Sequence, residues 1–188
     1  DLSLTVPVGS FYGMVGPNGA GKTTTLSMAT GLLRPDAGQS LIHGVDLWAE
    51  PLKAKALIGN LSDGVKLFDR LTGEQLVTYN GLLFGLDRDE VAERVADLLK
   101  LLDLESAAGT LVVDYSAGMT KKIALACALV HAPRLLALDE PFESVANGRV
   151  LVAGTVDEVR DGSTLEDRFV DLVGGRTHAE GPEWLRRS

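Results

Sequence analysis

The stretch Gly16-Pro17-Asn18-Gly19-Ala20-Gly21-Lys22-Thr23-Thr24 predicts the fold of this chain more directly than any other part of the sequence. It fits the pattern G-x-x-x-x-G-K-[ST], a loop that joins a strand to a helix and surrounds phosphate groups. Its glycines allow a tight turn that presents backbone N–H groups to phosphates. Because the following helix begins at about Lys22, its positive dipole end faces the same anion. We therefore expect this chain to bind a nucleoside triphosphate.

Two side chains of this loop carry the chemistry. Lys22 is expected to reach the β- and γ-phosphate oxygens, and the Thr23 hydroxyl is expected to ligate Mg²⁺. The flanks agree with this interpretation, because residues 11–15 are predicted as a buried strand and residues 24–30 as a helix that ends before Gly31. A glycine-rich turn that matches the pattern by chance would not require those flanks.

The composition limits the possible classes of protein. A chain of 188 residues can build one well-packed domain. Its net charge of −8 disfavours a broad nucleic-acid surface, so we expect no nucleic-acid partner. No apolar run approaches the roughly 18 residues that span a bilayer. A single cysteine, Cys127, excludes an internal disulfide and is predicted to be a small buried hydrophobe. The absence of a starting methionine suggests that the true start is missing.

The middle of the chain is predicted to be helical. Thr72 and Gln75 fit a capping box that opens a helix through about Phe84. A second helix is expected from Asp89, with an apolar face. We interpret residues 64–115 as a helical insert. The apolar face of the helix expected from Asp89 consists of Val91, Val95, Leu98, Leu99 and Leu102.

The rest of the chain shows alternating strands and helices, which indicates an α/β core. Residues 1–15 are consistent with two strands around a turn at Pro7, and residues 57–61 with another strand. A third helix should begin near Ser116, followed by a buried strand over residues 135–138. A further strand is expected at 149–154 and a helix at 165–173. One domain is predicted over 1–173, with 1–63 and 116–173 as its α/β core, and residues 174–188 are predicted as a C-terminal tail.

An acidic pair, Asp139-Glu140, ends the predicted strand at 135–138. In a nucleotidase with this kind of phosphate loop, Asp139 would hold Mg²⁺ through water opposite Thr23. Glu140 stands where a carboxylate can orient and deprotonate the attacking water, so we predict it as the catalytic residue. The alternative is that the two acids merely solvate the end of a strand, a common arrangement.

The segment Ser116-Ala117-Gly118-Met119 lies between the insert and this strand. A small, hydroxyl-bearing turn at a helix N-terminus can make an anion site. In this order of motifs, the chain resembles the nucleotide-binding subunits of ABC transporters, whose signature reads Ser-Gly-Gly-Gln. The resemblance implies that these four residues contact the ATP bound by a partner subunit. Alone, the segment would be a plain Ser N-cap.

The resemblance covers most of residues 1–144 and again about 147–173. It implies a P-loop NTPase fold with a helical ABC-type insert and an antiparallel β piece, with ATP and Mg²⁺ as cofactors. It also implies a homo- or heterodimer with a second ATP-binding subunit, bound to transmembrane permease subunits at the cytoplasmic face of the cell membrane. Residues 163–169 resemble the tail of bacterial drug-export subunits, which favours export.

The chain departs from the family at several positions. Asp63 stands where the family has a glutamine that contacts Mg²⁺, and as a carboxylate it could still ligate the metal. Ala117 replaces the first glycine of the signature pair. A crossover and the family's switch histidine are not found between Pro141 and the strand expected from Arg149. The abrupt join at Ser144–Asn147 favours an omitted segment over a chain that truly lacks it. None of the histidines fits the switch role, and His131 is expected to cap or solvate a helix end.

These features lead to one preferred function and two alternatives. We expect an ATPase subunit that powers export, with hydrolysis at Glu140. The departures at Asp63 and Ala117 keep open a nucleotide-binding regulatory subunit with impaired hydrolysis. A soluble ABC ATPase without a transport role is the other alternative, although such proteins usually carry tandem domains or long coiled-coil insertions. The substrate is chosen by the membrane subunits and is not encoded here.

Overall fold

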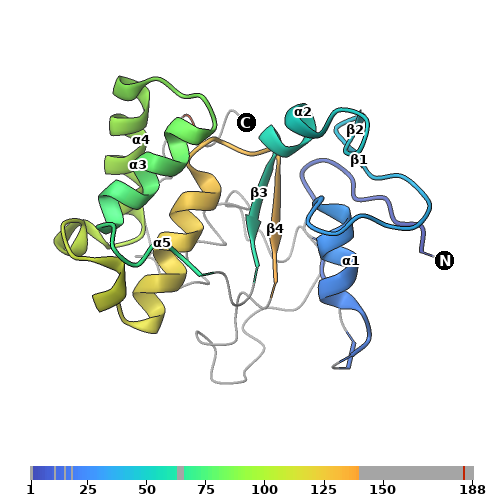
Figure 1. The fold of residues 1–188 in the computed structure, drawn as a ribbon, viewed down its shortest axis with the longest axis horizontal. Coiled ribbons are helices and arrows are strands. Elements are labelled where there is room, and N and C mark those ends of the chain that lie inside the picture. Colours follow the sequence, from blue (N-terminus) through green and yellow to red (C-terminus); the bar gives the residue numbers. More distant parts are fainter. Residues whose placement is uncertain are drawn as a thin grey trace.

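The computed structural model describes residues 2–10, 12–14, 16–17, 19–62, 66–139 and 184. Within these residues, a two-stranded parallel sheet lies between helix α1 on one side and a group of three helices on the other (Figure 1). The predictions for Asn18, Asp63, Glu140, the strand at 149–154 and the helix at 165–173 lie outside the described residues.

The parallel sheet consists of β3 (Ile58–Leu61) and β4 (Leu135–Leu138). Ile58 pairs with Leu135 and Leu61 with Leu138. Ala137 is buried, whereas its neighbours in β4 are only partly buried. Both strands predicted here from the sequence are therefore present, and their carboxyl ends lie at the same edge.

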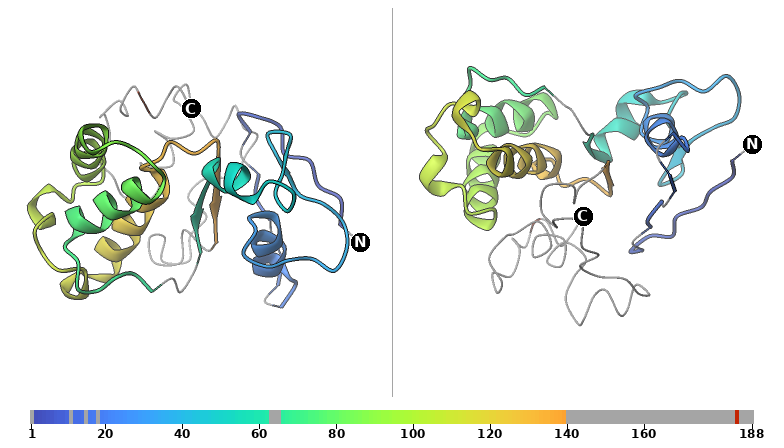
Figure 2. Two further views of the ribbon diagram at one scale, coloured as in Figure 1. Left: turned by 45° about the horizontal axis from the view of Figure 1, so that its top comes forward. Right: turned by 90° about the horizontal axis from the view of Figure 1, so that it is seen from below.

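Three helices beside the sheet share one hydrophobic core. They are α3 (Gly73–Leu83), α4 (Arg88–Leu101) and α5 (Ala117–Leu129). Short 3₁₀ turns η1 (Glu105–Ala107) and η2 (Val112–Asp114) connect α4 to α5. Figure 2 shows this group separated from α1 by the strands in both additional views. The fully buried side chains at its centre include Leu76, Val77, Leu98, Leu102, Ile123 and Val130.

The helix starts follow local capping. The Thr72 side chain accepts from the Gln75 N–H and the Gln75 side chain accepts from the Thr72 N–H, which confirms the predicted capping box. Helix α4 begins at Arg88, slightly earlier than expected, because the carboxylate of Asp87 accepts from the Glu90 N–H at 2.9 Å.

A small β-hairpin and a short helix cover the other side of the sheet. Strands β1 (Leu41–Ile42) and β2 (Val45–Asp46) pair antiparallel around His43 and Gly44, which both have positive φ. Helix α2 (Pro51–Ala56) follows. A second, smaller core joins the hairpin to the sheet through Ile42, Leu47, Ala54 and Ile58.

The N-terminal strands expected from the sequence are not found. The turn at Pro7 is present, since the Ser10 N–H donates to the Pro7 carbonyl at 3.2 Å. Residues 2–6 and 12–14, however, form no strand, and the side chain of Tyr12 is 54% exposed. Alternating apolar residues favour an extended chain, but a strand also needs a hydrogen-bonding partner, and these residues pair with none among those described.

Candidate nucleotide-binding site

The phosphate loop leads into α1 (Lys22–Ala29) through a left-handed turn. Gly21, the residue before the helix, has φ +86°, and Gly19 has φ +82°. Residues other than glycine rarely adopt such positive φ angles. The two glycines therefore allow the loop to reverse its direction. The Ala20 N–H donates to the Pro17 carbonyl at 3.1 Å and closes the turn. The helix N-terminus then lies at the loop, where its unpaired N–H groups favour an anion.

Lys22 folds back over this loop. Its Nζ donates to the Gly16 carbonyl at 2.8 Å and to the Pro17 carbonyl at 3.1 Å. Among the described residues, the hydrogen-bond partners of the ammonium are these two backbone carbonyls. A phosphate entering the loop would meet one full positive charge beside the backbone N–H groups.

Thr23 and Asp139 meet across the fold. The Thr23 hydroxyl donates to Asp139 Oδ1 at 3.3 Å, although the two residues are 116 positions apart in the chain. Asp139 is placed by β4, and its N–H continues the ladder by donating to the Leu61 carbonyl at 2.9 Å. Figure 1 shows the phosphate loop and the carboxyl ends of β3 and β4 at the same lower end of the molecule. Ligands of parallel α/β sheets bind at this edge.

The donor set fits Mg²⁺. A hydroxyl and a carboxylate are hard oxygen ligands, and Mg²⁺ commonly binds through one or two such groups together with water and substrate phosphates. Among the described residues, no group of three or more His, Cys, Asp or Glu gathers that could hold a metal alone. Thr23 and Asp139 would hold the ion, and once bound it would neutralise charge on the phosphate oxygens.

The predicted signature segment opens α5. The Ser116 side chain accepts from the Met119 N–H at 3.3 Å, and the Thr120 N–H donates to the Ser116 carbonyl at 2.8 Å. Ser116, Ala117 and Gly118 are exposed. Within the described part of the chain no hydrogen bond links this segment to the phosphate loop. The structure thus unites Thr23 and Asp139 and leaves the signature open to solvent.

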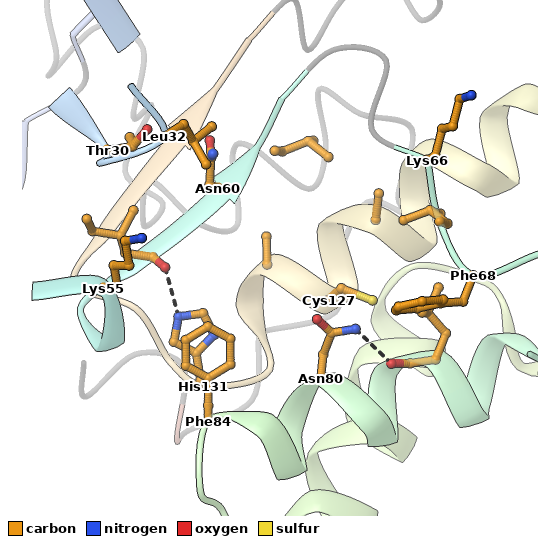
Figure 3. Close-up of a pocket in the computed structure, with 16 residues that line it drawn as sticks. Thr30, Leu32, Lys55, Asn60, Lys66, Phe68, Asn80, Phe84, Cys127 and His131 are labelled. Carbon is orange, nitrogen blue, oxygen red and sulfur yellow. Dashed lines mark hydrogen bonds between the residues drawn. The ribbon is translucent and has the colours of Figure 1, made fainter. Parts of the chain in front are cut away.

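A cavity of about 350 Å³ lies between β3, α3 and α5, and the sequence did not predict it (Figure 3). His131, just after α5, stacks face to face on Phe84 with ring centroids 3.6 Å apart. Its Nε2 donates to the Ile58 carbonyl at 3.1 Å, while its buried Nδ1 has no hydrogen-bond partner among the residues that the structure describes. The expectation that His131 caps or solvates a helix end is therefore wrong. This environment forms only when the end of α3 and the start of β3 come together around His131, so no local pattern signals it.

Burial shifts the pKa of two groups that line this cavity. It lowers the pKa of His131 below the usual 6.5, an effect opposed by the hydrogen bond to the Ile58 carbonyl and reinforced by the positive charge of Arg94. It raises the pKa of the Cys127 thiol to about 12. Cys127 therefore stays protonated at neutral pH, as expected for a packed side chain rather than a nucleophile.

Comparison with known proteins agrees with this geometry. Residues 1–143 match the family model described as ABC transporter. The chain is 40% identical over 142 residues to the ABC transporter ATP-binding protein NatA of Bacillus subtilis, covering 75% of this chain and 58% of NatA. It is 35% identical to the doxorubicin resistance ATP-binding protein DrrA of Mycobacterium tuberculosis, covering 96% of this chain and 59% of DrrA. The chain thus spans about three fifths of the length of these relatives.

The fold is also similar to a solved structure. The dimeric bacterial ABC transporter cassette MJ0796 superposes with a TM-score of 0.69 at 25% identity, covering 77% of this chain and 66% of that one. In the described part of this chain, no helix is long and apolar enough to cross a membrane.

Proposed function

Since this chain belongs to the ABC transporter family of ATP-binding proteins, we propose that it binds and hydrolyses ATP to power export of a substrate through membrane permease subunits. The observation that carries the proposal is the contact between Thr23 Oγ1 and Asp139 Oδ1, because it joins the phosphate loop to the acidic strand. The names of the drug-resistance relatives support export over import. The proposed location is the cytoplasmic face of the membrane, bound to the permease.

The residues are proposed to divide the work as follows. The loop over residues 16–24 binds the triphosphate, with Lys22 leaving the Gly16 and Pro17 carbonyls to reach phosphate oxygens. Thr23 and Asp139 hold Mg²⁺, with Asp63 as a further candidate ligand. Glu140 accepts a proton from the attacking water and keeps that water in line with the γ-phosphate.

The open signature supports a shared site. Ser116, Ala117 and Gly118 are exposed, so they are free to face a second subunit. We propose that they and Met119 complete the ATP site of that subunit. ATP would then be enclosed between two chains, and its binding would close a dimer that hydrolysis reopens.

Glu140→Gln tests the catalytic assignment. We expect ATP to bind with unchanged affinity, turnover to fall nearly to background, and a closed dimer to accumulate in sedimentation experiments with ATP and Mg²⁺. Asp36→Asn, which neutralises an exposed acid away from the site, is the matched control and should leave all three unchanged. Turnover in Glu140→Gln equal to that of the parent would remove Glu140 from the mechanism.

Ala117 favours one competing function, a regulatory subunit with impaired hydrolysis. Its methyl group stands where the family has glycine and where backbone approaches phosphate. Ala117→Gly should raise turnover of the purified complex if that methyl group obstructs the site. A complex whose turnover responds only to an acidic-pair substitution in the other ATP-binding subunit would instead establish the regulatory role.

A further inference from the structure

The segment 108–112, just before the signature, is joined by backbone hydrogen bonds to residues 71–74 at the start of α3. We call these two bonded segments the platform. The Gly73 N–H donates to the Thr110 carbonyl at 3.2 Å, and the Glu74 N–H donates to the Ala108 carbonyl at 3.0 Å. A further bond runs from the Val112 N–H to the Leu71 carbonyl at 2.9 Å. The first N–H groups of a helix have no partner within the helix, and here another segment satisfies them. The platform therefore fixes the chain on both sides of Thr72.

Tyr115 is inserted into this platform. Its side chain is only 9% exposed, and its hydroxyl donates to the Ala107 carbonyl at 2.7 Å. Burial raises the pKa of the Tyr115 phenol above its usual 10.0. The next residue, Ser116, is the N-cap of α5 and begins the signature. The phenol is thus held one residue away from the exposed turn.

Gly73 provides the space for this phenol. A Cβ atom at residue 73 would lie 2.0 Å from the Tyr115 hydroxyl oxygen and 3.0 Å from its Cζ. It would also lie 3.3 Å from Ile123 Cδ1 on α5. Glycine in a helix costs about 1 kcal/mol relative to alanine, yet here no larger residue fits without moving the ring. Gly73 and Tyr115 are therefore complementary in shape.

We propose that Tyr115 is a positioning residue for the signature, fixed by the Ala107 carbonyl and by the space above Gly73. By holding the backbone that leads into Ser116, it aims the exposed turn of α5 at the nucleotide of the second subunit. A phenylalanine would fill the same volume but lose the hydroxyl that donates to the Ala107 carbonyl, which would keep only the Thr110 N–H, at 3.0 Å, as a donor. This inference rests on the proposed function, in which the signature completes a shared site.

Tyr115→Phe tests the hydroxyl in the Glu140→Gln background that accumulates the closed dimer. We expect ATP affinity of the single subunit to be unchanged and the ATP-dependent dimer to weaken about tenfold. Tyr79→Phe, in an exposed tyrosine of α3, should change neither. Val95→Ala removes buried volume from the same core and keeps the Tyr115 hydroxyl and its acceptor, so it shows how much lost stability alone weakens the dimer.

The complementarity is tested by a double-mutant cycle. Gly73→Ala should weaken the dimer strongly, and Tyr115→Phe should recover part of that loss because it removes the atom only 2.0 Å from the new methyl group. If Gly73→Ala fails to fold, Tyr115→Phe alone decides. Additive effects in the cycle, or a Tyr115→Phe dimer as tight as the parent, would overturn the proposal.

A measurement without nucleotide separates this inference from the proposed function. Hydrogen exchange of the Met119 and Thr120 amides, which bond to Ser116, should accelerate in Tyr115→Phe and stay unchanged in Tyr79→Phe. If Glu140→Gln accumulates no dimer, the proposal of a site shared between two subunits is wrong. Faster exchange in Tyr115→Phe would still support Tyr115 as the residue that positions the start of α5. Unchanged exchange in Tyr115→Phe would reject the positioning role of Tyr115 itself.

Discussion

At the scale of single residues, burial controls the ionisable groups around α5. Tyr115 lies before its first turn, Cys127 lies near its last turn, and His131 follows it. Burial favours the neutral form of each group. It raises the pKa of the Tyr115 phenol and of the Cys127 thiol, and it lowers the pKa of the His131 imidazole. These three groups at the two ends of α5 are therefore predominantly uncharged at neutral pH.

His131 should make stability depend on pH. Because its pKa is lower in the folded state than the usual 6.5, the unfolded chain binds the proton more readily, and stability falls as the pH drops below about 6.5. Urea unfolding at several pH values between about 5 and 7.5 measures this slope. His131→Gln keeps a donor for the Ile58 carbonyl and should show a flatter slope. An identical slope in the variant would assign the pH dependence to other groups.

Cys127 should react slowly with thiol reagents. With a pKa of about 12, the thiol carries almost no thiolate at pH 8, and its position beside the cavity limits access. We expect modification by a maleimide to proceed at least about tenfold more slowly than in a short cysteine peptide of ordinary pKa. In urea the rate should rise to that of the peptide. Rapid modification of the folded chain would show that the cavity opens in solution.

At the scale of elements, side-chain caps set where α3, α4 and α5 begin. Thr72, Asp87 and Ser116 each accept from a backbone N–H three residues later. Such caps depend on a few consecutive residues, so the helices could be predicted from the sequence to within a residue or two. Strands need partners elsewhere in the chain, which is why the apolar alternation before the phosphate loop led to the wrong expectation for residues 12–14.

Thr72→Ala should destabilise the fold by about 1 kcal/mol, because it leaves the Gln75 N–H without its acceptor. The free energy of unfolding in urea measures the effect. Thr78→Ala, also on α3 but outside the capping box, is the matched control and should change stability by less than about 0.5 kcal/mol. Equal losses in both variants would mean that the box contributes nothing beyond ordinary helix packing.

Some residues of the candidate site could be predicted from the sequence and others could not. Lys22, Thr23 and Asp139 were predicted from motifs whose spacing follows from phosphate chemistry, and the structure brings Thr23 and Asp139 together. Glu140 remains a prediction. The fit of Tyr115 above Gly73 and the stack of His131 on Phe84 depend on segments that are distant in the chain. No local pattern encodes such contacts.

At the scale of the whole molecule, Trp184 contacts two residues of α4 that are distant from it in the sequence. Its indole N–H donates to Asp97 Oδ2 at 2.9 Å, and the Arg94 guanidinium lies 4.6 Å from the ring centroid. Arg94 also donates to the Val130 carbonyl at 2.8 Å, at the end of α5. The tryptophan is thereby connected through one arginine to the helix that carries the signature.

Trp184→Ala should lower the free energy of unfolding by about 1–2 kcal/mol, since it removes a cation–π contact and a partly buried hydrogen bond. Trp184→Phe keeps a ring above Arg94 but loses the donor, so its loss should be smaller. Chemical unfolding measures both values, followed by circular dichroism to avoid relying on the removed fluorophore. Wild-type stability in Trp184→Ala would show that this contact does not stabilise the fold in solution.

The contact between Thr23 and Asp139 has a consequence for the order in which the protein folds. A pair 116 positions apart can form only after a long loop closes, and that entropy cost precedes any gain from the contact. The capped helices need no such closure. We therefore expect the insert to gain structure early during refolding and the contact between Thr23 and Asp139 to form late, when β4 joins β3. Binding of Mg²⁺ with ATP would then report the completion of the fold.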